Sequence, residues 1–389
     1  MIPVAYNVRS LFVRKATTIA TVLGVALVVF VLAASQMLAQ GIRRTMGNSG
    51  DAESAIVLRK GSDAELSSNL ENNLVSLIKA APGVKVGEGG APIASGEIVV
   101  VIAPQLVDQP GQVANVLVRG VAAEVYALRP QVHIVEGHAA KPGTNEVVIG
   151  KRIRGKFTGI DLGSTFELNK NRPATVVGVF ESGGSSFESE VWGDVDTVRA
   201  AFGRNGIVSS VTVRLLSAAN YDVFAAEVEH DKQLGLKVQR ESDYYEKQSE
   251  GTSKFISFLG SAIVFFFSVG AMIGAAITMY AAVANRRREI GTLRALGFSG
   301  GQVLVSFLLE AVLLALLGGA VGVVASLSMM WVEFTMMNFA TWSEVVFNFV
   351  PTVKIIVTAL LAGGLMGVLG GFLPAVRAAR TSPLVAMRD

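Results

Sequence analysis

Reactive and metal-binding side chains are sparse in this 389-residue sequence and form no recognisable catalytic pattern. The only histidines are His133, His138 and His230, and none has a second ligand at the spacing typical of a metal site. There is no cysteine, so neither a thiolate nucleophile nor a disulfide bond is available. No Gly-x-Ser-x-Gly motif marks a serine nucleophile. We therefore expect a chain that is not itself an enzyme and that binds no metal ion or cofactor of its own.

Two short stretches come closest to binding motifs. "GKRIRGKF", residues 150–157, approaches the Gly-x4-Gly-Lys phosphate loop, but Phe157 replaces the Ser or Thr that would bind magnesium, so ATP is not expected there. "ESGGSSFESEVWGD", residues 181–194, is interpreted either as a turn beside a strand edge or as a contact loop for a partner or substrate. The residues of that contact loop would be Glu181, Phe187, Glu188 and Trp192.

A highly charged short segment, "NRRREIGTLRALGFS", residues 285–299, carries four arginines and lies between two long apolar stretches. Ile290, Leu293 and Leu296 recur at i, i+3 and i+6, which predicts a short helix with one apolar face, ending at Gly297. A basic amphipathic helix of this kind could lie on anionic lipid headgroups. Because both of its ends are tied to apolar stretches, it could instead be a coupling helix, through which a bound protein moves both stretches together.

Four apolar stretches are long enough to cross a membrane, since a helix needs about 20 residues to span the hydrocarbon core. They lie at 17–39, 255–283, 303–328 and 353–374, in a chain that is 51% hydrophobic and 17% charged. The first apolar core is longer than that of a cleaved signal peptide, and we therefore expect it to remain as an anchor.

The distribution of basic residues predicts the orientation of these spans, because Lys and Arg accumulate on the cytoplasmic side. The segments before the first span, between the second and third, and after the fourth carry a net charge of +8, whereas residues 43–254 carry −3. Both termini are therefore expected in the cytoplasm. The overall charge of +3 reflects membrane orientation and does not indicate nucleic-acid binding.

Within the third span, Glu310 is the one charged residue. A charge at that depth is costly and usually faces protein or water. Glu310 is interpreted as an acceptor for a neighbouring helix or for the arginine-rich segment, as a coupling residue, or as part of a proton relay. Glycines at four-residue spacing predict close helix packing, within or between subunits. They are Gly270, Gly274, Gly318, Gly322, Gly363, Gly367 and Gly371.

Residues 40–254 predict a mixed α/β domain. Alternating apolar residues indicate strands at 55–61, 96–104, 114–121 and 209–216, and a helix is expected from Ser62, which would form a capping box with Glu65. We interpret 45–121 and 205–242 as one split α/β part, 122–200 as a β-rich insertion and 243–254 as a stalk. The predicted fold is an α-helical membrane protein with four transmembrane helices plus a large mixed α/β extracytoplasmic domain inserted between helices 1 and 2. A coupling helix at 284–302, a short periplasmic loop at 329–352 and a cytoplasmic tail at 375–389 complete it.

Several of these segments resemble the FtsX and MacB type of ABC transporter permease, a type VII or mechanotransmission transporter. "NRRREIGTLRALGFSGGQV" followed by "FLLEAVLLALLGGAVG" is similar to the entrance of that family's third span. "YNVRSLFVRKATTIATVLGVALVV" resembles its cytoplasmic amphipathic N-terminal helix, here 1–16, and its first span. "NEVVIG", "LGSTFELN" and "ATVVGVFES" resemble the β-rich part of its periplasmic core domain, and "LPAVRAARTSPLVAMRD" resembles its C-terminal signature.

The resemblance implies a permease subunit of the bacterial inner membrane that pairs as a homodimer or heterodimer. Two copies of a cytoplasmic ABC ATPase, which uses ATP and Mg, would bind it, and we expect a separate chain because the first span begins at residue 17. ATP hydrolysis would drive periplasmic movement and thereby export or extract a lipid, lipoprotein, peptide or hydrophobic drug. Membrane lipid and a periplasmic adaptor are further expected partners. The expected ATPase contacts are Arg286, Arg287, Arg288, Glu289, Ile290, Gly291, Leu293, Arg294, Leu296 and Gly297.

Two other functions stay open. Some relatives move no cargo and instead activate periplasmic cell-wall hydrolases, and a bound hydrolase would favour that function. A stand-alone membrane receptor or anchor is the third interpretation, and failure to bind any ATPase would favour it. The sequence decides neither the substrate nor the choice between a homodimer and a heterodimer.

Overall fold

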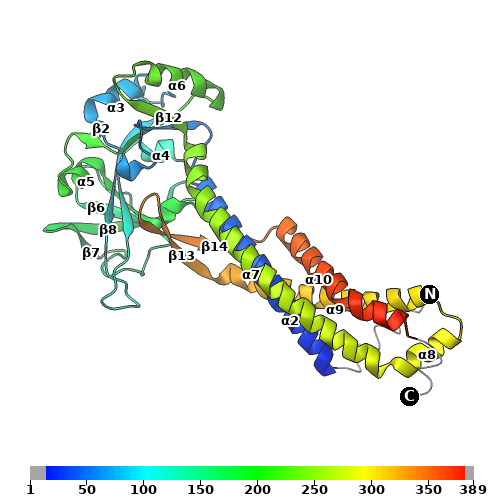
Figure 1. Cartoon of the computed structure of the whole chain (residues 1–389). Helices are drawn as coiled ribbons and strands as arrows, with labels where there is room; N and C mark the ends of the chain where they lie inside the picture. The colour runs from blue at the N-terminus through cyan, green and yellow to red at the C-terminus, as the bar shows by residue number, and fades with distance from the viewer. Residues whose placement is uncertain (1–14, 382–389) are drawn as a thin grey trace. The chain divides into compact units, whose positions relative to one another are not determined.

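The computed structural model describes residues 15–381, which fold into two compact units (Figure 1). The helical unit contains the chain up to Gly41, Ser253–Glu333 and the chain from Asn348 onward. The sheet unit contains Ile42–Thr252 and Phe334–Phe347. The amphipathic helix predicted at 1–16 therefore lies almost entirely outside the described residues, as does the end of the predicted tail.

Four helices are long and apolar enough to cross a membrane. They are α2 (Lys15–Gly47), α7 (Glu241–Asn285), α9 (Gly300–Leu327) and α10 (Val353–Ala379). A short helix, α8 (Arg287–Ala295), connects α7 to α9, and the 3-10 turn η4 (Ser328–Trp331) follows α9. Both α2 and α7 extend beyond the predicted spans, and residues 42–47 of α2 and 241–252 of α7 belong to the sheet unit.

Close packing at glycines joins three of these helices. A Cβ atom at Gly322 on α9 would lie 2.4 Å from the carbonyl oxygen of Ala26 on α2, and one at Gly371 on α10 would lie 2.4 Å from Cβ of Ala311 on α9. Similar close approaches occur at Gly318, Gly363 and Gly367. By contrast, a Cβ at Gly270 or Gly274 on α7 would meet no atom of the described chain within 4 Å. The glycine rows of α9 and α10 therefore serve packing within the chain, whereas the pair on α7 does not.

The sheet unit is built on a ten-stranded sheet with the order β12-β1-β11-β3-β4-β9-β6-β8-β5, to which β7 is added beside β8. Its strands are β1 (Ser54–Arg59), β3 (Ala94–Ile102), β4 (Val116–Val121), β5 (His133–Gly137), β6 (Glu146–Gly150), β7 (Thr165–Asn169), β8 (Arg172–Glu181), β9 (Glu190–Asp194), β11 (Ser210–Arg214) and β12 (Leu236–Arg240). The β4–β9 and β6–β8 pairs are parallel and the other pairs are antiparallel. The predicted α/β part and β-rich insertion thus share one continuous sheet.

Short helices and a small strand pair complete the sheet unit. They are η1 (Glu65–Ser67), α3 (Asn72–Lys79), α4 (Val125–Leu128), η2 (Ser186–Ser189), α5 (Val195–Ala201), η3 (Ala218–Asn220), α6 (Tyr221–His230), and the pair β2 (Leu70–Glu71) and β10 (Ile207–Val208). The helix predicted from Ser62 is wrong, because the helix begins only at Asn72 and Ser62 forms no capping box. Glu65 is instead buried and bonded to Arg119 at 2.8 Å.

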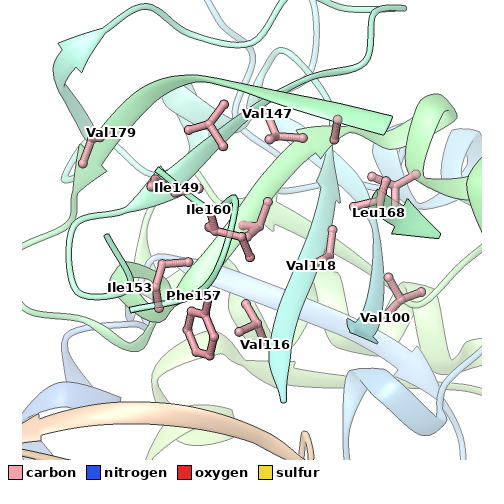
Figure 2. Packing of buried hydrophobic residues seen from close by; sticks show 14 of the residues in the cluster. Val100, Val116, Val118, Val147, Ile149, Ile153, Phe157, Ile160, Leu168 and Val179 are labelled. Carbon is pink, nitrogen blue, oxygen red and sulfur yellow. The ribbon is translucent and has the colours of Figure 1, made fainter. Parts of the chain in front are cut away.

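Two apolar cores lie along the sheet. One is built by β1, β11, β12, α3 and α6, and includes Val57, Ile78, Val213 and Phe224. The other belongs to the β-rich part, and Figure 2 shows Val116 and Val118 of β4 among the side chains that fill it, together with Phe157 and Ile160. β3 contributes to both cores, through Ala94 to the first and Ile98 to the second. The alternation of apolar residues along these strands explains why they were predictable.

The segment predicted as a short loop at 329–352 contains a β-hairpin, formed by β13 (Glu333–Asn338) and β14 (Ser343–Asn348). β14 is tied to the rest of the sheet unit, because Glu344 N donates to Asn115 O at 2.8 Å and Val346 N donates to Ser189 Oγ at 3.1 Å. Phe334–Phe347 therefore belong to the sheet unit, whereas both ends of the segment belong to the helical unit.

Candidate functional site

The arginine-rich segment forms a tightly capped turn between α7 and α9. Arg286 stands in the one-residue break between α7 and α8. α8 ends in a Schellman motif, in which Phe298 N donates to Leu293 O, Gly297 N donates to Arg294 O, and Gly297 has φ +95°. α9 then begins with a capping box between Ser299 and Gln302. The end of α8 and the start of α9 are therefore both capped, with no uncapped helix end between them.

A buried ion pair anchors the turn. Arg286 Nη1 donates to Glu310 Oε2 at 2.8 Å, and the two residues are 8% and 4% exposed. The guanidinium also lies 3.5 Å from the exposed Glu289 carboxylate and 5.9 Å from the ring centre of Phe307. Glu310 thus accepts a bond from the arginine-rich segment, which was the first of its three interpretations.

The predicted apolar face of the short helix is divided between two environments. Ile290 is buried and packs with Val283, Val303 and Phe307 in the helical unit. Leu296 lies just beyond the end of α8 and is 73% exposed. The prediction that Ile290 contacts a partner is therefore wrong, since its side chain packs internally, and Leu296 is the large apolar side chain that α8 presents outward.

The other predicted coupling residues also divide by burial. Arg287, Arg288, Glu289 and Gly297 are exposed, Leu293 and Arg294 are half-buried, and Gly291 is buried. The end of α10 lies beside this turn, because a Cβ at Gly300 would come within 2.9 Å of Ala379 O. Two exposed arginines and an exposed leucine on a rigid, capped turn form a surface suited to an acidic and partly apolar partner.

The predicted contact loop at 181–194 is not a surface loop. Phe187, Glu188 and Trp192 are fully buried, and only Glu181 is accessible, in an exposed pair with Lys151. Phe187 and Trp192 pack with ring centres 5.5 Å apart. The prediction of a contact loop is therefore wrong for these three residues, because the apolar rings and a paired carboxylate fill the interior of the sheet unit.

Sequence reasoning missed a buried charge cluster in the sheet unit. Its members are Glu65, Glu97, Arg119, Arg129, Glu190 and Glu241, each at most 5% exposed. The signal was present in two strands, where Glu97 and Arg119 interrupt otherwise apolar runs. Across residues 15–381, no group of His, Cys, Asp or Glu side chains is placed to hold a metal ion.

Pairing and burial set the protonation of this cluster. Burial alone would raise the pKa of Glu97, but Arg129 and Arg119 lower it below its ordinary value. Burial raises the pKa of Glu241 to about 7, against the lowering effect of Arg129. Burial likewise raises the pKa of Glu190, in spite of its bond to Arg119. With four carboxyl groups and two guanidinium groups, the cluster favours holding a proton near neutral pH.

Comparison with known proteins assigns both units. Residues 16–231 match the family described as MacB-like periplasmic core domain, and residues 261–383 match the family described as FtsX-like permease C-terminal. The macrolide export ATP-binding/permease protein MacB of Escherichia coli strain K12 is 31% identical over 228 residues, which cover 56% of this chain and 34% of the relative. The same protein of Shigella flexneri gives equal figures. The chain thus spans about a third of the length of these curated relatives.

Two solved structures are similar to parts of the chain. The periplasmic region of MacB from Actinobacillus actinomycetemcomitans is 14% identical, with a TM-score of 0.38, and the match covers 54% of this chain and 97% of that one. The extracellular domain of the noncanonic ABC-type transporter YknZ from Gram-positive bacteria is 16% identical, with a TM-score of 0.37, and covers 48% and 99%. The two family matches carry the assignment: this chain belongs to the FtsX/MacB-type permeases, the transmembrane, non-catalytic components of ABC transporters.

Proposed function

We propose that this chain couples ATP hydrolysis by a cytoplasmic ABC ATPase to a conformational change of its sheet unit, which lies in the periplasm. That change drives the export or extraction of a hydrophobic or amphiphilic molecule, such as a lipid, lipoprotein, peptide or drug. The chain lies in the bacterial inner membrane, with both termini and α8 on the cytoplasmic side. The basic residues of these segments support this orientation. ATP and Mg are bound by the ATPase.

The capped turn around α8 is the observation that carries this proposal. It exposes Arg287, Arg288 and Leu296, while Arg286 is held by Glu310 on α9 and Ile290 is held by the helical core. A protein bound to the exposed residues therefore grips a segment that cannot move without α7 and α9. An ATPase that binds one arrangement of these helices more tightly than another would shift the equilibrium between them.

The packing of the helical unit favours a lever over a tunnel. α9 approaches both α2 and α10 at glycines, so that backbone and small side chains are in direct contact where an aqueous path would need space. A substrate handled on the periplasmic side does not need to cross the membrane. This supports an amphiphilic cargo that is already in or near the outer leaflet.

A second permease chain is proposed to pack against α2 and α7. A groove of about 370 Å³ between these helices is lined in part by Thr21, Gly24, Phe266, Gly270 and Gly274. Its glycines allow a helix backbone to approach closely, and packing within the described chain does not use Gly24, Gly270 or Gly274. The partner is a second copy in a homodimer or a related chain in a heterodimer.

Co-purification tests the ATPase contact. The tagged chain is extracted from its native host in mild detergent, and bound proteins are identified by mass spectrometry. The mass of the intact complex then gives the number of permease chains in it. Wild type is expected to retain two ATPase copies, and Leu296→Asp is expected to lose them while remaining folded, because Leu296 is outside the core. Leu216→Asp is the matched control, since Leu216 is 61% exposed but belongs to the sheet unit.

The outcomes separate the candidate functions. Retention of the ATPase by the Leu296→Asp variant would contradict the assignment of this surface. Absence of any ATPase from the wild-type sample would contradict the transporter function and favour a stand-alone receptor. A cell-wall hydrolase in the sample, with ATPase activity that amphiphiles do not stimulate, would favour the regulatory alternative over transport. A periplasmic adaptor in the sample would support export.

A further inference from the structure

The buried charge cluster lies where α7 enters the sheet unit. Its six side chains come from η1, β3, β4, the residue after α4, β9 and the first residue of α7. All are at most 5% exposed, and Arg119 and Arg129 lie 5.4 Å and 4.7 Å from the ring centre of Phe187. The cluster therefore joins elements that are far apart in the sequence around one aromatic ring.

Arg119 holds the centre of the sheet. Its Nε bonds to Glu190 Oε2 at 2.8 Å, and its Nη1 bonds to Glu65 Oε1 at 2.8 Å and to Glu97 Oε2 at 2.9 Å. Ser210 Oγ donates to Glu65 Oε1 at 2.7 Å. These bonds connect η1 with four neighbouring strands, β11, β3, β4 and β9. Arg119 thus bonds the strands to one another, and its charge also acts on Tyr245 of α7.

Arg129 connects the sheet to α7. Its two terminal nitrogens bond to the two oxygens of Glu97, at 2.5 Å and 3.2 Å, and Nη2 also donates to Glu241 Oε1 at 3.1 Å. A guanidinium bonded to both oxygens of a carboxylate has a fixed orientation. Arg129 therefore holds the first residue of α7 in a defined position relative to β3.

Three further contacts fix the same end of α7. Asp51 N donates to Glu241 Oε2 at 3.2 Å, and Glu65 N donates to Tyr244 Oη at 3.0 Å. A Cβ at Gly50 would lie 2.5 Å from Glu241 O, so the chain leaving α2 is also pressed against this turn. The extensions of α2 and α7 thus end at one place, and the cluster connects that place to the sheet.

Apolar side chains would stabilise the contact between α7 and the sheet at least as well as this cluster does, because burying charges carries a large desolvation cost. What charge-assisted bonds add is direction, since they hold only at short range and in one geometry. α7 is one helix from Glu241 to Asn285 and its sequence contains no proline, so it has no proline kink that would absorb a displacement. We take α7 as the element that would carry a displacement of Asn285, next to α8, to Glu241.

We propose that the buried charge cluster is the joint through which movement of α7 enters the ten-stranded sheet, and that Arg129 is the positioning residue that grips Glu241. This inference rests on the proposed function, because it names the place where ATP-driven movement passes from the helices to the periplasmic domain. Arg119 keeps the strands together as one body, and Arg129 couples that body to the helix. Loss of the second contact therefore removes the charged link between α7 and β3, while Tyr244 stays bonded to Glu65 and β12 still leads directly into α7.

Hydrogen exchange of the full chain with its ATPase in lipid nanodiscs tests the joint. In wild type, ATP with vanadate is expected to change exchange in residues 241–252 and also in 94–121, which include β3 and β4. Glu241→Leu removes the grip but leaves Arg129 paired with Glu97, so no guanidinium is stranded. The change in 94–121 is expected to be lost in this variant, while that in 241–252 persists. Glu241→Gln, whose amide oxygen can still accept the bond from Arg129 although the bond from Asp51 N is lost, is expected to restore the response.

Two controls keep the result interpretable. Glu181→Leu breaks an exposed ion pair in the same unit and is expected to respond like wild type. Exchange without ATP shows whether Glu241→Leu is folded, and if it is not, Arg129→Lys replaces it, since lysine cannot contact Glu97 and Glu241 in the same geometry. A wild-type response in 94–121 that both variants retain would overturn the joint. No response in wild-type 241–252 or 94–121 would overturn the proposed function, and the joint with it.

Discussion

Both units bury arginine against glutamate, but the two sites differ in how completely the charges are enclosed. In the helical unit, Arg286 pairs with the buried Glu310, and its second carboxylate neighbour, Glu289, is more than half exposed. In the sheet unit, Arg119 and Arg129 meet four carboxyl groups, all of them buried. At the first site Glu289 is open to solvent and to a bound protein. At the second site, all four carboxyl groups that pair with Arg119 and Arg129 are closed to solvent.

The difference suggests different duties for the two sites. An exposed carboxylate beside a buried ion pair can respond to a protein that binds from outside, as expected where an ATPase acts. A closed cluster with an excess of carboxyl groups is sensitive to the loss of any one cation, because each remaining charge stays buried. The turn is therefore suited to receiving a movement from a bound protein. The cluster is suited to transmitting that movement, because its charged groups have no other partners to pair with.

Among the changes that test this comparison, Arg119→Met is expected to have the largest effect on the free energy of unfolding. It leaves Glu65 and Glu190 buried without their guanidinium partner, and we expect the sheet unit to lose about 3–5 kcal/mol of stability. Urea unfolding of the full chain, followed by the fluorescence of Trp192 with Trp331 and Trp342 replaced by Phe, measures this loss. Arg154→Met, which breaks exposed pairs with Glu136 and Asp161, is the control and is expected to change nothing measurable. Equal, small losses in both variants would contradict a tightly enclosed cluster.

The next effect comes from pH, because the cluster holds an extra proton. Burial raises the pKa of Glu241 from 4.5 to about 7, so between these values the folded state binds a proton that the unfolded state does not. The sheet unit is therefore expected to become more stable, by about 2 kcal/mol, as the pH falls from about 7.5 to about 5. Below 4.5 the trend reverses, because the unfolded state then binds a proton at Glu97 that the folded state, in which the pKa of Glu97 is lowered, does not bind.

The same Trp192 measurement across this pH range tests the prediction. Glu241→Gln cannot take up the proton and is expected to show a much flatter profile. A wild-type profile that rises with pH between 5 and 7.5 would contradict the assignment of the proton to this cluster.

Much of the fold was predictable because its signals are local. The four long apolar helices follow from length and composition, and strands such as β1, β3 and β4 follow from apolar residues in sequence. The helix expected to begin at Ser62 does not form there. The capping box would have used the Glu65 side chain, which instead bonds to a distant partner. Glu65 gains three bonds from Arg119 and Ser210 in the folded sheet, and no sequence window contains both sides of that contact.

The two arginine sites differ in the same respect. Arg286 and Glu310 lie 24 residues apart, within adjoining helices, so a pairing between the arginine-rich segment and Glu310 could be expected from the sequence. The cluster depends on the order of the strands, and above all on the parallel pairing of β4 with β9, which brings Arg119 opposite Trp192 and beside Glu190. Strand order across a β-rich segment is not encoded in any local pattern. Of the two interpretations of 181–194, the contact loop failed for Phe187 and Trp192 for the same reason, whereas a turn followed by a strand is present there.

The smallest effect on stability is expected at the coupling turn itself, from Glu310→Gln. The amide oxygen still accepts a bond from Arg286, and Glu289 remains 3.5 Å from the guanidinium, so the expected loss is about 1 kcal/mol. Glu310→Leu removes the acceptor and should lower the melting temperature of the detergent-solubilised chain further. ATPase co-purification should survive in the Gln variant, since the exposed residues of α8 keep their positions, and weaken in the Leu variant. If Glu310→Gln instead destabilised the chain as much as Arg119→Met, the turn would have to be as closed as the cluster, and its suitability for responding to an outside partner would be refuted.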